Sequence, residues 1–73
     1  MNKLIFYLDP SAEGKNTKYM GELKRDGSFK GDPRLKKNLE RSINFNNYDL
    51  QKDADWLELR EKFSGTMMIT VME

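Results

Sequence analysis

Short apolar runs separated by polar, turn-forming segments predict the strands of this chain. Residues 3–8 are branched or aromatic with hardly a polar break, and they end at Asp9-Pro10, where proline cannot continue a hydrogen-bonded ladder. Residues 18–24 alternate well enough for a second strand, and Asp26-Gly27 favours a tight hairpin turn after it. A short third strand is expected around Phe29, and the apolar residues 66–72 predict a closing strand.

A first helix is predicted directly after the third strand. Asp32 is a good N-cap because its side chain accepts hydrogen bonds from free backbone amides, and Pro33 at the first helical position loses no bond. The turn-forming residues 44–47 end this helix. Its buried stripe, at i, i+4 spacing, is Leu35, Leu39 and Ile43.

A second helix is expected to begin near Asp49 or Asp53 and to run through Glu61 or Phe63, with Gly65 just past its end. Helical spacing gives it two apolar stripes on opposite sides. One stripe is Trp56, Leu59 and Phe63, and the other is Leu50, Ala54 and Leu57. One stripe can face the sheet, so the other must meet the first helix, a neighbouring molecule or water.

The element order is therefore β-β-β-α-α-β in a single domain, residues 1–73. This order predicts an α+β fold in which a small antiparallel or mixed sheet of three to four strands carries two helices packed on one face. No internal repeat, linker or low-complexity tract interrupts it.

The first and last predicted strands have two apolar faces each. Alternate side chains of a strand take opposite faces, and two short helices can cover only one face of the sheet. The other face would stay partly open and is a candidate for contact with a partner, because methionine and tyrosine are typical of adaptable contact surfaces. The candidate partner-binding residues are Ile5, Tyr7, Met68, Thr70, Met72 and, on the second helix, Leu57.

Composition narrows the function. The 73 residues contain neither cysteine nor histidine, which excludes disulfides, the usual zinc sites and His-dependent nucleophile systems. We therefore expect no cofactor and no metal. The first apolar run is too short for a signal peptide or a membrane span, so we expect a cytoplasmic protein without a membrane partner. The frequent lysine and asparagine are typical of A/T-rich coding DNA, as in many phages.

The charges are unevenly distributed although they nearly cancel, at +1 overall. Residues 1–41 hold ten Lys or Arg against six acids, and residues 42–73 hold three against six. A basic hairpin and helix face could contact several phosphates, which makes a nucleic-acid-binding module the alternative function. Its candidate residues are Lys24, Arg25, Lys30, Arg34, Lys37 and Arg41.

An enzymatic function has little support in the sequence. Asp9 at the end of the first strand, with Glu22 and Lys24 in the second, resembles in miniature the Asp…Glu-x-Lys pattern of metal-dependent nucleases. The likeness covers three residues, and Glu-x-Lys is frequent by chance. The sequence therefore predicts a non-catalytic interaction domain, a small regulator or inhibitor that docks on a larger protein or self-associates.

Overall fold

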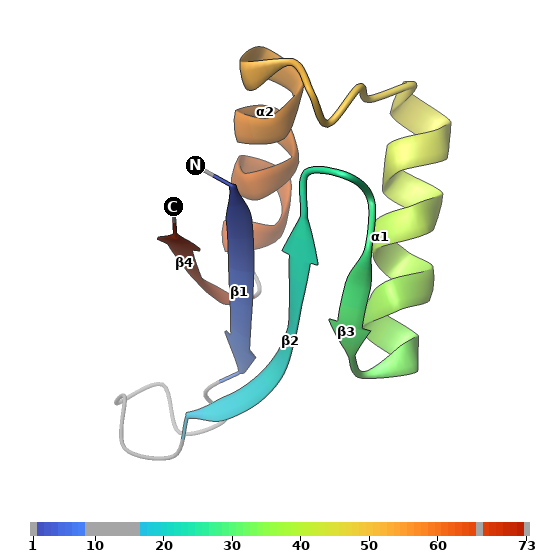
Figure 1. Ribbon diagram of the computed structural model, residues 1–73. Coiled ribbons are helices and arrows are strands. Elements are labelled where there is room, and N and C mark those ends of the chain that lie inside the picture. Colours follow the sequence, from blue (N-terminus) through green and yellow to red (C-terminus); the bar gives the residue numbers. More distant parts are fainter. Residues whose placement is uncertain (1, 9–16, 66, 73) are drawn as a thin grey trace.

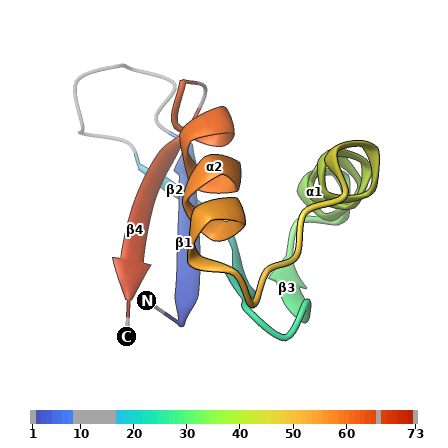
Figure 2. The ribbon, with the colours of Figure 1, turned by 90° about the horizontal axis from the view of Figure 1, so that it is seen from above.

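Four strands form one antiparallel sheet in the order β3-β2-β1-β4, and two helices lie on the same side of it (Figures 1 and 2). The computed structural model describes residues 2–8, 17–65 and 67–72 of the 73. The predicted α+β class and the order β-β-β-α-α-β are confirmed. The elements are β1 (Lys3–Leu8), β2 (Lys18–Lys24), β3 (Phe29–Gly31), α1 (Pro33–Asn46), α2 (Asp53–Ser64) and β4 (Met68–Met72).

The central strand β1 pairs with β2 on one side and with β4 on the other. Leu4 and Phe6 are fully buried against the helices, while Ile5 and Tyr7 point to the opposite face. Both faces of β1 therefore carry apolar side chains, Leu4 and Phe6 on one and Ile5 and Tyr7 on the other. The sequence predicted this two-sided character correctly.

A bulge in β2 changes the register between β1 and β2. Phe6 lies opposite Gly21 and Tyr7 lies opposite Tyr19, so Met20 is the extra residue. Met20 is buried, and Tyr19 joins Tyr7 on the face away from the helices. The bulge therefore places a second tyrosine on that face.

The β2–β3 hairpin has a three-residue loop. The Lys24 amide donates to the Ser28 carbonyl (2.9 Å), and the Gly27 amide donates to the Lys24 carbonyl (3.0 Å). The Asp26 carboxylate accepts bonds from the Ser28 hydroxyl (2.6 Å) and amide (2.8 Å), which lower the pKa of Asp26. The predicted hairpin turn is thus confirmed.

Helix α1 begins as the sequence predicts. Asp32 caps it by accepting from the Arg34 amide (2.8 Å). The guanidinium of Arg34 also bonds the Asp32 carboxylate, and these bonds lower the pKa of Asp32. The stripe packs on the sheet through Leu35 and Leu39, with Ile43 partly buried.

Helix α2 begins at Asp53, not at Asp49, and this corrects one expected stripe. The Asp49 carboxylate accepts from the Gln51 amide (3.0 Å), and the Asp55 carboxylate accepts from the Asp49 amide (2.8 Å). These bonds hold the segment before the helix as a turn. Leu50 is therefore buried in a turn, whereas Ala54 and Leu57 lie exposed on the helix, so the three do not form one stripe.

The opposite stripe of α2 packs into the core. Trp56 and Leu59 are fully buried, and Phe63 meets the ring of Phe6 edge-on at 6.2 Å between centroids. Helix α1 contacts chiefly β3, and α2 contacts chiefly β4. Both helices thus cover the same face of the sheet (Figure 2).

Candidate functional site

The face of the sheet opposite the helices is the principal candidate site. We call it the open sheet face. Both helices pack on the other side, and in the described part of the chain no helix lies over this face (Figure 2). Its residues, placed by strand register, are Lys3, Ile5, Tyr7, Tyr19, Glu22, Lys24, Lys30, Met68, Thr70 and Met72.

The apolar part of the open sheet face lies toward β4. Tyr7 stands between Tyr19 and Met68 on neighbouring strands, and the two tyrosine rings meet edge-on with centroids 6.1 Å apart. Met68 is 51% exposed and Met72 is 44% exposed. Five of the six predicted partner-binding residues, Ile5, Tyr7, Met68, Thr70 and Met72, therefore share this face.

The sixth predicted residue, Leu57, is not part of the open sheet face. It lies on α2, in the layer on the opposite side of the sheet, and is 37% exposed. Tyr19 was not predicted as part of this face, because strict alternation from Lys18 to Lys24 does not reveal the bulge at Met20. The pair of tyrosines follows only from the register.

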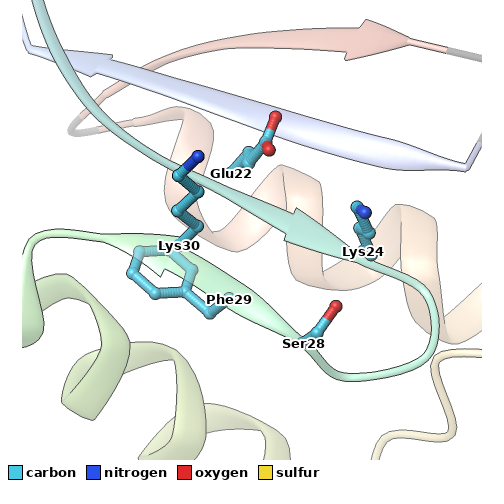
Figure 3. Close-up of a pocket in the computed structure, with 5 residues that line it drawn as sticks. All are labelled: Glu22, Lys24, Ser28, Phe29 and Lys30. Carbon is cyan, nitrogen blue, oxygen red and sulfur yellow. The ribbon is translucent and has the colours of Figure 1, made fainter.

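The polar part of the open sheet face lies toward β3. Glu22 faces Lys30 across the strands, and its carboxylate lies 3.5 Å from the Lys3 ammonium. Figure 3 shows Glu22 and Lys30 side by side at a shallow pocket of about 100 Å³ that Lys24, Ser28 and Phe29 also line. This arrangement suits charged groups of a partner surface.

The geometry of the pocket does not support a nuclease-like site of Asp9, Glu22 and Lys24. Among the described residues that line the pocket, Glu22 is the one carboxylate, and Asp9 lies outside the described residues. Within the described ranges no group of three or more acidic, histidine or cysteine side chains could hold a metal ion.

The six predicted phosphate contacts lie on separate surfaces. Lys24 and Lys30 belong to the open sheet face, while Lys37 and Arg41 are exposed on α1, across the sheet from it. Arg34, also on α1, is bonded to Asp32. The structure does not bring these cations into one strip.

Arg25 is bound within the chain. Its Nε donates to the Leu50 carbonyl (2.7 Å), its Nη1 lies 2.8 Å from an Asp53 carboxylate oxygen, and its guanidinium stacks over Trp56 at 5.5 Å. The Gln51 side chain donates back to the Arg25 carbonyl (2.9 Å). Arg25 therefore cannot reach a phosphate without breaking contacts of the fold.

A second candidate surface is an open groove of about 690 Å³ along the second half of α1, which Lys62 of α2 also lines. Phe45, at its rim, is 88% exposed. Phe45 was not predicted as a site residue, because asparagines flank it and it lies off the Leu35 stripe. The other lining residues are Asn38, Arg41, Ser42, Asn44, Asn46 and Lys62.

Comparison with known proteins gives no family assignment. No protein-family model, curated protein or solved structure matches the chain significantly. Among the described residues, no helix has both the length and the apolar character needed to cross a membrane.

Proposed function

We propose that this protein is a non-catalytic interaction domain, a small cytoplasmic regulator that docks on another protein chain through its open sheet face. The observation that carries the proposal is that Tyr7, Tyr19, Met68 and Met72 share a sheet face that neither α1 nor α2 covers. Aromatic residues and methionine are enriched at protein interfaces, where they supply apolar contact area.

Energetics support contact with a partner. Fully burying a side chain of this kind contributes about 1.5–3 kcal/mol. Tyr19, Met68 and Met72 are already about half-buried, so covering each of them would contribute roughly half of this. Three or four such side chains together would be comparable to the net stability of about 3–5 kcal/mol that a core of this size supplies.

The polar part of the face supports the choice of a protein partner. Lys3, Glu22 and Lys30 combine both signs of charge beside the apolar part. A rim of mixed charges orients a protein partner with complementary charges. A nucleic acid, by contrast, would meet the carboxylate of Glu22 at the centre of the cationic side chains.

The test is a double variant of the face. Tyr7→Ala with Met68→Asp is expected to abolish binding of the partner while circular dichroism and the emission of the buried Trp56 stay those of the wild type. Candidate partners are captured from the native host, purified singly and titrated with the wild-type protein and the variant.

The matched control is Phe45→Ala, which removes an exposed aromatic ring on the opposite side of the molecule. It should leave the affinity unchanged. Loss of binding in the control but not in the double variant would move the docking site to the groove along α1. Loss of the fold in the double variant would show that Tyr7 and Met68 belong to the core.

A further inference from the structure

The outer edge of β4 has no strand beside it in the described sheet. β4 is the last strand in the order β3-β2-β1-β4, and in Figure 2 its side away from β1 carries no helix. Natural edge strands are usually protected by lysine, proline, a bulge or a covering element. The residues of β4, Met-Ile-Thr-Val-Met, include neither lysine nor proline nor any charge, and its register with β1 is regular.

We propose that this edge binds a second copy of the chain, with two β4 strands antiparallel about a twofold axis at Thr70. The inference rests on the proposed function, because the paired copies would present their open sheet faces as one continuous docking surface. An edge strand can bind another strand through hydrogen bonds of its outward backbone N–H and C=O groups. Because the sequence of β4 is nearly the same in both directions, we infer that the strand it binds is an identical β4.

The backbone directions fix which groups are offered. The Asn2 amide donates to the Met72 carbonyl (2.9 Å), so the backbone of Met72 points toward β1. Successive residues of an antiparallel strand turn their backbone groups to alternate sides. Thr70 therefore also faces β1, in register with Ile5. The residues that turn their N–H and C=O outward are Ile69 and Val71.

The side chains of β4 read nearly the same in both directions. With Thr70 on the axis, Ile69 lies opposite Val71 of the second copy, and Met68 lies opposite its Met72. Each Ile69–Val71 pair exchanges two backbone hydrogen bonds, so that the junction holds four. Thr70 lies opposite Thr70 of the second copy, and this pair exchanges no backbone hydrogen bonds. Side chains lie closest in such non-hydrogen-bonded pairs, where Thr–Thr and β-branched pairs are favourable.

The two faces of the sheet also continue across this junction. Met68, Thr70 and Met72 of both copies would extend the open sheet face, and Ile69 and Val71 would meet on the side of α2. The opposite edge of the sheet is less suited to pairing with another strand, because β3 has three residues and contacts α1. Pairing through β4 alone gives a closed dimer in place of a growing chain of sheets.

The first experiment measures molar mass by sedimentation equilibrium between roughly 1 μM and 1 mM, the range that covers weak to moderate affinities. The wild-type chain should reach twice the monomer mass of 8.6 kDa. Thr70→Lys and Thr70→Glu, each alone, should weaken the dimer at least tenfold, since like charges meet on the axis. An equimolar mixture of the two variants should restore a dimer. Asn44→Lys, on exposed α1, is the control and should dimerise like the wild type.

The second measurement separates edge pairing from contact between two open sheet faces. Amide hydrogen exchange by NMR should slow at least tenfold at Ile69 and Val71 as the dimer forms, because these amides gain acceptors. The amides of Thr70 and Met72 already face β1 and should change little.

Three outcomes overturn the inference. They are a wild-type chain that stays monomeric up to 1 mM, a mixture of Lys and Glu variants that stays monomeric, and a dimer in which Ile69 and Val71 remain unprotected. The proposed function fails separately. Tyr7→Ala leaves the β4 edge intact, so this variant should still dimerise while losing a foreign partner bound to the open sheet face.

Discussion

The side chain of Arg25 joins two segments that are far apart in the sequence. It connects the β2–β3 turn to the turn before α2 by its bonds to Leu50 and Asp53 and by its stacking on Trp56. Arg25 was predicted as a phosphate contact because an arginine in a hairpin turn is usually exposed. Its partners lie more than twenty residues further on, and spacing along the chain does not reveal such contacts.

We expect Arg25→Ala to lower the free energy of unfolding by about 2–3 kcal/mol, because hydrogen bonds of a charged group and the packing on Trp56 are lost together. Urea denaturation followed by Trp56 emission measures this change. Lys24→Ala, one residue away and exposed, should change stability by less than about 0.5 kcal/mol. Equal effects of the two variants would contradict the structural role of Arg25.

Among the elements, β2 and β3 approach each other at two facing glycines. Gly21 pairs with Gly31, and both have positive φ, 151° and 147°. A Cβ on Gly31 would collide with the backbone of Met20 and Gly21. On Gly21 it would lie 2.5 Å from the Phe29 ring, which occupies that space. The β2–β3 hairpin therefore depends on glycine at both positions.

Gly31→Ala should cost about 2–4 kcal/mol of stability, because backbone atoms cannot move aside and the φ is strained for alanine. Thermal unfolding followed by circular dichroism measures the loss. Gly65→Ala is the control: its φ is −73° and a Cβ there meets nothing within 4 Å. A Gly31 variant as stable as this control would refute the close approach of the strands.

The elements differ in how far the sequence determines them. Helix α1 was predicted well because Asp32 and Pro33 mark its start and because the residues of the Leu35 stripe repeat at the i, i+4 spacing of a helix. The start of α2 stayed ambiguous because Asp49 and Asp53 are equally plausible helix starts in the sequence, whereas in the structure Lys52 is the N-cap and makes no side-chain cap bond. The bonds of Asp49 with Gln51 and Asp55 hold the residues before Asp53 as a turn, and the spacing of apolar residues does not reveal them.

At the scale of the molecule, the sequence predicted that one sheet face would lack a cover. Alternation in residues 3–8 and 66–72 was enough for this, because it identifies two-sided strands without knowledge of their neighbours. Strand order could not be predicted from the sequence, because no local feature indicates that β4 pairs with β1 and forms an edge of the sheet. The free edge of β4 follows from that order, and the pairing of Tyr19 with Tyr7 follows from the bulged register of β1 with β2.

The central place of β1 also sets an order of assembly. β1, β2 and β3 form a meander of neighbouring segments, whereas the β1–β4 ladder joins Lys3 to Met72. Closing so long a loop costs entropy before any contact is gained, so β4 should dock after the transition state for folding. In stopped-flow experiments Leu23→Ala should mainly slow folding, whereas Val71→Ala should mainly speed unfolding. The opposite pattern would mean that the two ends of the chain meet first.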